Sequence, residues 1–200
     1  MTDLEVKDFL TETKAIFRDF KLSEMIGDCN NKITLKTPRK GFFSFLYSGW
    51  DLIDDLNEMG GVLTGSTALS FYRFNGESLL GRSPQDWDYL LDRETFLKFC
   101  GKNNISNFKY STSRIMVDIK TGVNMGSDGY GGPDRFMFKH EIDIVAQDGD
   151  KTPYIEVGKY KVATLESIIQ GKLDLIELSP ETKHIKDCNY IISKLHSHKR

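Results

Sequence analysis

With 200 residues, the chain is long enough for one domain, or for one domain with a small appendage. Hydrophobic residues make up 39% of it and charged residues 28%, which is typical of a globular protein and excludes general disorder. Lysine and arginine number 27 against 29 aspartates and glutamates, a formal net charge of −2. This balance excludes a protein whose whole surface is positively charged for binding nucleic acid, but it allows a local basic strip.

The sequence also bears on the cellular compartment. No apolar run approaches the roughly 20 residues of a membrane span, and the first residues lack the basic and apolar stretches of a signal peptide. Cys29, Cys100 and Cys188 are too widely spaced for a metal-binding knuckle. We therefore expect a soluble, cytoplasmic protein of a reducing compartment with no membrane partner.

The first half of the chain predicts helices around a short strand. Residues 2–20 have an apolar stripe at helical spacing, and Thr2 and Glu5 have the spacing of a capping box. A second helix over 43–58 should stop at Gly60-Gly61. In order, the remaining expectations are a buried strand at 62–64, a helix at 67–74 and a polar loop at 75–84.

The second half predicts more strands, followed by two helices. Its elements are a strand at 87–91, a helix at 93–100, strands at 113–120 and 135–146, an extended segment at 154–162, and helices at 164–177 and 181–195. Five glycines in the connector 122–133 predict a mobile flap. Helices around short strands make an α/β (α+β) fold. We divide it into a helical segment (1–60), a core (61–162) and carboxy-terminal helices (163–200), within one compact domain.

The strand-to-helix junction at Gly65-Ser66 is the first candidate for chemistry. A glycine there lets a phosphate approach the backbone, and a helix start offers N–H groups that lack helical partners. The simpler interpretation is a tight turn between a strand and a helix.

The second candidate is the pair Asp86 and Asp88. On a strand, residues i and i+2 point to the same face, so both carboxylates enter one space. Two close carboxylates repel each other unless a cation lies between them, and Mg²⁺ takes carboxylate oxygens together with phosphate oxygens. Other acidic pairs share this spacing by composition, but the apolar residues that accompany Asp86 and Asp88 indicate a strand.

A third acidic residue, Asp143, stands between Ile142 and Ile144. A carboxylate in such a strand is costly to bury without a cation or hydrogen-bond donors. Because Glu141 shares its face under strand alternation, a solvent-facing acidic edge is the alternative.

Together these stretches resemble the DNA polymerase β-like nucleotidyltransferase superfamily, and most closely the AbiEii/AbiGii-type toxin nucleotidyltransferases. The residues that carry the resemblance are Gly65-Ser66-Thr67-Ala68-Leu69, Arg82-Ser83-Pro84-Gln85-Asp86-Trp87-Asp88 and Ile142-Asp143-Ile144. The resemblance implies a minimal nucleotidyltransferase fold, in which a short mixed sheet is flanked by helices and the carboxy-terminal helices pack beside it.

The resemblance also implies roles for these residues. Asp86, Asp88 and Asp143 would be the catalytic, metal-binding carboxylates for Mg²⁺ or Mn²⁺, and Gly65 and Ser66 would bind the phosphates of a nucleoside triphosphate such as ATP. Arg82 and Lys172 would neutralise phosphate charge. A nucleoside monophosphate would pass to a hydroxyl of RNA (a 3′ end), a protein or a small molecule, and an antitoxin or another protein is a partner that the resemblance allows.

Lys172 also stands out without the resemblance. It falls within the apolar stripe of the helix at 164–177, so it must either extend along the surface to solvent or meet an anion. If that anion is a triphosphate, replacing Lys172 by methionine should not lower stability. Relatives have a similar lysine, followed by a Lys-Asp-x-x-Asp helix; here Lys186-Asp187 is present but Tyr190 stands at the second acidic position.

Charge distribution agrees with two interpretations of this end of the chain. Residues 151–200 contain nine lysines and arginines against six acidic residues. They form either a solvated helical tail or the cationic wall of an anion site. Two other functions remain as alternatives to an enzyme. One is a non-catalytic binding or scaffold module of the same fold, and the other is a small α/β domain whose acidic residues are ordinary surface residues.

Overall fold

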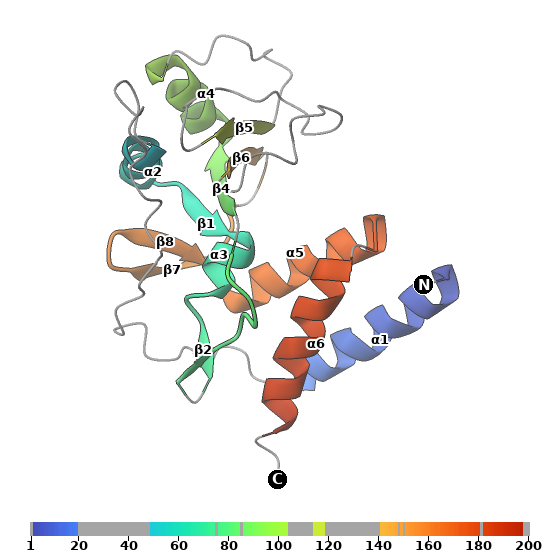
Figure 1. Ribbon diagram of the computed structural model, residues 1–200. Coiled ribbons are helices and arrows are strands. Elements are labelled where there is room, and N and C mark those ends of the chain that lie inside the picture. Colours follow the sequence, from blue (N-terminus) through green and yellow to red (C-terminus); the bar gives the residue numbers. More distant parts are fainter. Residues whose placement is uncertain are drawn as a thin grey trace.

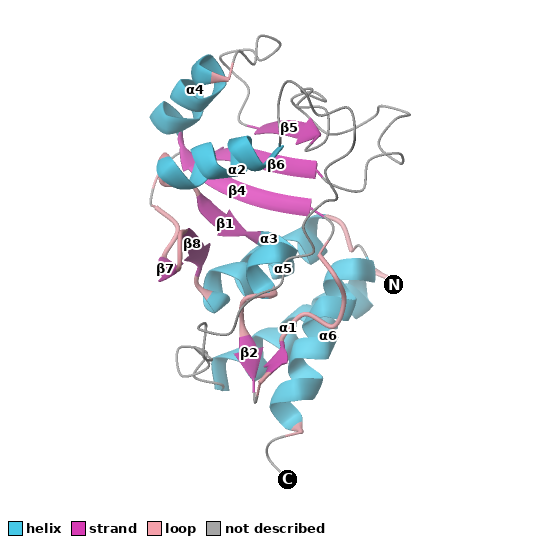
Figure 2. Cartoon of the chain, turned by 60° about the vertical axis from the view of Figure 1, so that its left-hand side comes forward, coloured by secondary structure: helices cyan, strands magenta, loops and turns pink. Residues whose placement is uncertain are grey.

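The computed structural model describes residues 2–19, 49–74, 76–84, 86–103, 114–118, 141–147, 149, 151–180 and 182–197. Within these ranges a six-stranded mixed sheet is flanked by helices (Figures 1 and 2), which confirms the expected α+β class. The glycine-rich flap expected at 122–133 lies outside the described residues, as do Cys29, the start of the helix at 43–58, both ends of the strand at 113–120 and the start of the strand at 135–146.

The main sheet has the strand order β5-β6-β4-β1-β8-β7. The pairs β1–β8 and β4–β6 are parallel, and β1–β4, β5–β6 and β7–β8 are antiparallel. The strands are β1 (Val62–Thr64), β4 (Asp86–Asp92), β5 (Arg114–Asp118), β6 (Glu141–Gln147), β7 (Tyr154–Val157) and β8 (Tyr160–Ala163).

Strand alternation gives the sheet two chemically different faces. In β4, Trp87, Tyr89 and Leu91 are buried, whereas the alternate residues remain partly exposed. The helices α2 (Gly49–Glu58) and α4 (Arg93–Lys102) lie on the buried face: α4 packs against β4 and β6, and the Tyr89 hydroxyl donates to Asn57 Oδ1 of α2 at 3.1 Å. The other face is therefore left to residues that can form a site.

Three helices pack together beside the sheet, and they are far apart in the sequence (Figure 1). They are α1 (Asp3–Asp19), α5 (Leu165–Leu178) and α6 (Thr182–His196). The predicted capping box begins α1, because the Thr2 amide donates to Glu5 Oε2 at 2.7 Å and the Glu5 amide donates to Thr2 Oγ1 at 3.3 Å. Helix α1 buries Val6, Leu10 and Phe17 against the common core.

The prediction of a helix at 67–74 is wrong over its second half. Helix α3 (Gly65–Leu69) ends early because the chain turns to bury Phe71 and Tyr72, whose hydroxyl donates to the Ala163 carbonyl at 2.7 Å. A hairpin of β2 (Arg73–Phe74) and β3 (Glu77–Ser78) then replaces part of the predicted loop. Tertiary burial has overridden a local helical pattern here.

The extended segment predicted at 154–162 is two strands rather than one. Gly158 has a φ of +59°, a conformation that glycine adopts without steric cost, and it reverses the chain between β7 and β8. Among the described helices, none combines the length and the apolarity needed to cross a bilayer.

Candidate functional site

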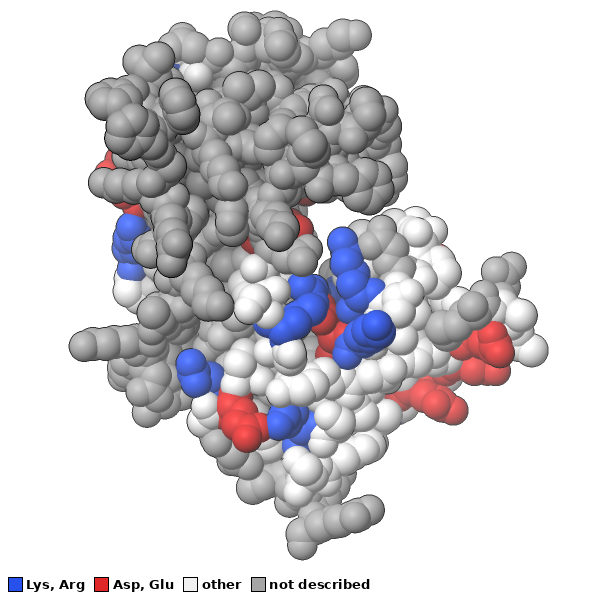
Figure 3. Space-filling model, viewed as in Figure 1, with Lys and Arg blue, Asp and Glu red and all other residues white. Residues whose placement is uncertain are grey.

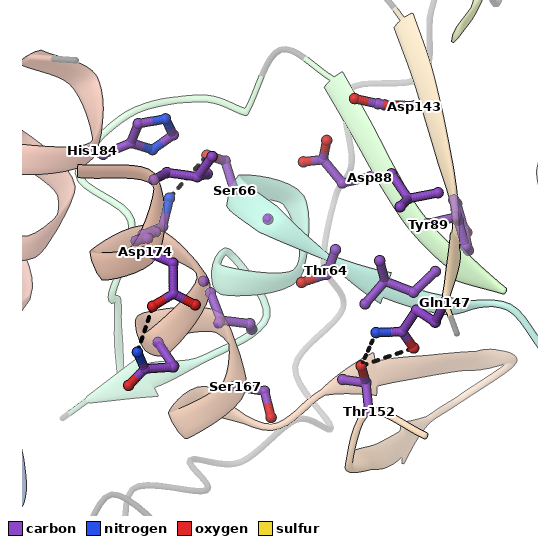
Figure 4. Close-up of a pocket in the computed structure, with 18 of the residues that line it drawn as sticks. Thr64, Ser66, Asp88, Tyr89, Asp143, Gln147, Thr152, Ser167, Asp174 and His184 are labelled. Carbon is purple, nitrogen blue, oxygen red and sulfur yellow. Dashed lines mark hydrogen bonds between the residues drawn. The ribbon is translucent and has the colours of Figure 1, made fainter. Parts of the chain in front are cut away.

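A cavity of about 910 Å³ lies between α5 and the partly exposed face of the sheet (Figure 4). Six of the seven predicted site residues line it, and only Arg82 does not. The six are Gly65, Ser66, Asp86, Asp88, Asp143 and Lys172. The structure thus brings together segments that lie more than 100 residues apart in the sequence.

The carboxylates lie on the sheet wall of the cavity. Asp88 and Asp143 are direct partners in the parallel register of β4 and β6, and Asp86 lies two residues before Asp88 on the same face. Asp143 is only 9% exposed, so it does not belong to a solvent-facing acidic edge. The hydroxyl of Thr67 donates to the Asp86 carbonyl and connects the start of β4 to α3.

The donor chemistry fits a divalent cation that the protein shares with a ligand. Asp88 and Asp143 supply carboxylate oxygens from neighbouring strands. However, no three Asp, Glu, His or Cys side chains within the described ranges converge as a metal-binding group. Mg²⁺ commonly takes only one or two protein carboxylates and completes its shell with substrate phosphate oxygens and water. These residues fit that mode of binding better than a cage made by the protein alone.

Gly65 makes room for Asp88. Its φ is +66°, and a Cβ built on it would lie 1.9 Å from Asp88 Oδ2. We expected this glycine to admit a phosphate, but the structure gives it another role, because the Asp88 carboxylate occupies the space where a side chain would be. The turn at Gly65 and the position of the Asp88 carboxylate on β4 therefore depend on each other.

A buried network of two cations and one carboxylate adjoins the cavity, and Lys172 and Ser66 are the parts of it that line the cavity. Asp187, on α6, is 3% exposed. It accepts hydrogen bonds from Arg82, Nε to Oδ1 at 3.0 Å and Nη2 to Oδ2 at 2.9 Å, and from Lys172 Nζ to Oδ2 at 2.8 Å. Lys172 does not extend to solvent: it is 3% exposed and the anion that it meets belongs to the protein.

Both cations also hold Ser66. Its Oγ accepts from Arg82 Nη2 at 2.8 Å and, at 3.4 Å, from Lys172 Nζ. A hydroxyl has two acceptor lone pairs and one donor. Because two positive donors occupy the lone pairs, the hydroxyl proton of Ser66 is left to donate, and an anionic oxygen is the acceptor that such a polarised group favours.

Tyr190 supports the segment that carries Arg82. A Cβ on Gly81 would lie 2.7 Å from Tyr190 Cδ2, so the tyrosine ring lies directly on the backbone next to Arg82. The sequence resemblance implied an acidic residue at position 190, and this chain has a tyrosine instead. The tyrosine packs against the loop, and Lys194 of the same helix reaches across the Tyr190 ring to pair with Glu77.

The positive charges of Arg82 and Lys172 keep the carboxyl group of Asp187 ionised. Burial alone would raise the pKa of this carboxyl, but hydrogen bonds from Arg82 and Lys172 outweigh burial and hold the pKa below its usual value. Asp187 is therefore ionised at neutral pH.

Asp187 is the site residue that the sequence predictions omitted. The buried residues of α6 are Asp187, Cys188, Ile191 and Leu195, so an acid occupies an otherwise apolar stripe. Lys172 does the same in the neighbouring helix. Two opposite charges at inward positions of consecutive helices were the signal for a buried ion pair.

Replacing Asp187 by asparagine should destabilise the fold by about 3–5 kcal/mol, because it leaves the buried Lys172 ammonium without its counter-charge. Chemical denaturation followed by circular dichroism measures this difference. Lys172→Met should also destabilise, contrary to the expectation from sequence, because Asp187 then loses one of its two partners. The control is Glu94→Gln, which breaks an exposed pair with Lys98 and should leave the denaturation midpoint almost unchanged.

The stability difference between the wild type and Asp187→Asn should depend on pH. Asp187 has a lowered pKa in the folded state, so its contribution is complete above the unfolded value of about 3.9. It is lost as the pH falls through the lower, folded value. Denaturation curves from pH 7 downwards check this, and a difference that does not narrow in acid would contradict an ionised, paired Asp187.

Gly65→Ala should destabilise the fold by more than the roughly 1 kcal/mol of an ordinary glycine substitution, because both the positive φ and the Asp88 carboxylate oppose a Cβ. Gly76→Ala is a matched control: its φ is also positive, at +79°, but nothing within 4 Å meets the Cβ. Equal melting temperatures for the two variants would contradict the contact with Asp88.

Comparison with known proteins supplies no relative for this chain. No family model, no curated protein and no solved structure matches it. The function must therefore be argued from the cavity and its residues.

Proposed function

We propose that this protein is a metal-dependent nucleotidyltransferase, which transfers a nucleoside monophosphate from a nucleoside triphosphate to a hydroxyl group and releases pyrophosphate. One observation carries the proposal. Asp88 and Asp143, in register on adjacent strands, line one cavity with Lys172 and Ser66, which belong to the buried network of Arg82, Lys172 and Asp187.

The charge balance of this network supports an anionic ligand. Arg82 and Lys172 share the single carboxylate of Asp187, so this group retains a net charge of about +1 in a largely buried place. Lys183 and Lys186 add exposed positive charge on α6, and Lys and Arg side chains gather over this region of the surface (Figure 3). These observations favour the anion-site interpretation of the basic carboxy-terminal segment over that of a solvated tail.

The cavity combines the carboxylates of β4 and β6 with Lys172 and Ser66, and α5 adds the acidic residues Glu166 and Asp174 to its lining. Carboxylates together with a buried cation suit a triphosphate bound with a metal ion. Carboxylates alone would repel phosphate, and cations alone would not bind a metal. With both present, Asp86, Asp88 and Asp143 would hold Mg²⁺ or Mn²⁺, which when bound neutralises charge on the phosphates and lowers the pKa of an attacking hydroxyl. Ser66 would donate its hydroxyl proton to a phosphate oxygen.

The reaction then requires few further groups, because phosphoryl transfer depends chiefly on positioning and on electrostatic stabilisation. The acceptor oxygen forms a bond to the α-phosphorus, and the bond from that phosphorus to the bridging oxygen breaks. Asp143 would accept the proton of the acceptor hydroxyl. Arg82 and Lys172 would stabilise the charge that develops on the leaving pyrophosphate.

The acceptor is one of three kinds: the 3′ end of an RNA, a hydroxyl group of a protein, or a small molecule. An antitoxin or another protein partner belongs to the proposal only through the sequence resemblance. A non-catalytic binding or scaffold module of the same fold is the second candidate function. One observation favours it, namely that no three-residue metal-binding group converges within the described part of the chain.

Each of the changes Asp86→Asn, Asp88→Asn and Asp143→Asn should abolish transfer and keep the fold, because each removes a carboxylate oxygen but retains side-chain size. The assay incubates the protein with each of the four labelled nucleoside triphosphates, Mg²⁺, and either total RNA or total protein as acceptor. The control is Glu94→Gln, an acid outside the cavity, which should transfer as well as the wild type. Full activity of Asp88→Asn would exclude the enzyme, whereas nucleotide binding without transfer to any acceptor would favour the binding module.

Lys172→Met should weaken nucleoside triphosphate binding by about 1–3 kcal/mol, since the charge-assisted interaction with phosphate is lost. Calorimetry is to be done below the melting temperature of the variant, because the fold is also expected to be destabilised. Unchanged affinity in the folded variant would remove Lys172 from the phosphate site and leave it only its structural pairing with Asp187.

A further inference from the structure

The cavity continues well beyond the carboxylates, along the same face of the sheet. On β6, Asp143, Val145 and Gln147 alternate onto this face and all line the cavity. On β4, Leu90 follows Asp88 on the same face. The wall therefore changes from carboxylates, through two aliphatic side chains, to an amide at its far end.

The order and the length of these groups match a nucleotide. Gln147 lies four positions after Asp143 along the strand, about 13 Å away. This distance is comparable to the length of a nucleoside monophosphate from phosphate to base. A phosphate bound at the carboxylates would place its sugar over the aliphatic side chains, where α5 contributes Ile168 to the opposite wall. The base would then reach the amide end.

The amide at that end is held in place by a hydroxyl. The Gln147 Nε2 donates to Thr152 Oγ1 at 2.7 Å, and the Thr152 hydroxyl lies 3.0 Å from Gln147 Oε1 (Figure 4). Both residues are half-buried and both line the cavity. A glutamine amide has two N–H donors and an oxygen with two lone pairs. Thr152 engages one N–H and the oxygen of this amide, which leaves the second N–H and one lone pair of the oxygen, on opposite sides of the group, for a ligand.

We propose that Gln147, oriented by Thr152, reads the edge of the nucleobase and sets which nucleoside triphosphate this protein accepts. The inference rests on the proposed function and adds a specificity-determining residue to it. Nucleobases differ in the donors and acceptors along their edges, and the N–H or the lone pair of Gln147 that Thr152 leaves open can form a hydrogen bond with one of them. The alternative is that the Gln147–Thr152 pair only fastens the chain between β6 and β7.

The experiment measures the affinities of ATP, GTP, CTP, UTP and inorganic triphosphate for the wild type and for Gln147→Met, with Mg²⁺ present. Methionine retains the length of the side chain but removes both hydrogen-bonding groups. The wild type should favour one or two bases by about tenfold or more. In Gln147→Met this preference should fall to within about threefold, while inorganic triphosphate, which has no base, should bind unchanged.

Two further variants control the result. Gln170→Met makes the same substitution on α5, at a glutamine that lines the cavity but bonds to Asp174, and it should keep the wild-type order of affinities. Thr152→Val frees the amide without removing it, so it should reduce the preference less than Gln147→Met does, and it serves as the test if Gln147→Met does not fold.

The outcomes separate this inference from the proposed function. If the wild type binds the nucleotides but does not discriminate among them, or if Gln147→Met keeps the order of affinities, then Gln147 does not read the base, and nucleotide binding itself stands. If the wild type binds neither nucleotides nor inorganic triphosphate, the proposed function fails and the inference fails with it.

Discussion

The buried carboxylate of Asp187 connects three segments of the chain that have no local reason to meet. It pairs with Arg82 from the loop before β4 and with Lys172 from α5, while Asp187 itself belongs to α6. Removing a charge from water costs several kcal/mol, and this cost is offset only where partners of opposite charge and good geometry are present. The two cations meet that condition, and through them Ser66 is held at the edge of the cavity.

A second constraint acts where the two walls of the site come closest. The Asp88 carboxylate lies against the backbone of Gly65, so a residue of any other kind at position 65 would displace it. The acidic strand and the segment with the cation-held serine are thus in direct contact at one end of the cavity. Away from this contact the walls separate, and the cavity continues over aliphatic side chains towards Gln147.

These two constraints explain how a chain with almost no net charge can contain a strongly polar site. The charges are grouped locally: carboxylates lie side by side on β4 and β6, and Arg82 and Lys172 meet at Ser66. Asp187 neutralises one of the two cations that it binds. Composition averages over this grouping, which is why the net charge of −2 says little about the site.

The local patterns of the sequence were sufficient for much of the fold. The capping box of α1, the strands at β1 and β4, and helices α4, α5 and α6 follow from periodicity and from turn residues close in sequence. The same holds for the site residues that sit in such patterns: Asp86 and Asp88 share a face because strand geometry requires it. The helix at 67–74 failed because burial of Phe71 and Tyr72 depends on distant elements, which no local pattern contains.

The sequence by itself determined the fold class, the alternation that places Asp86 with Asp88, and the inward position of Lys172. Only the tertiary structure decided what each group meets: Asp143 beside Asp88, Asp187 between Arg82 and Lys172, and Gln147 at the far end of the same cavity. The physical reason is that periodicity fixes the face on which a side chain lies, because it depends on backbone geometry over a few residues. The partner across that face depends on which strands and helices become neighbours, and that is settled by burial of the whole core.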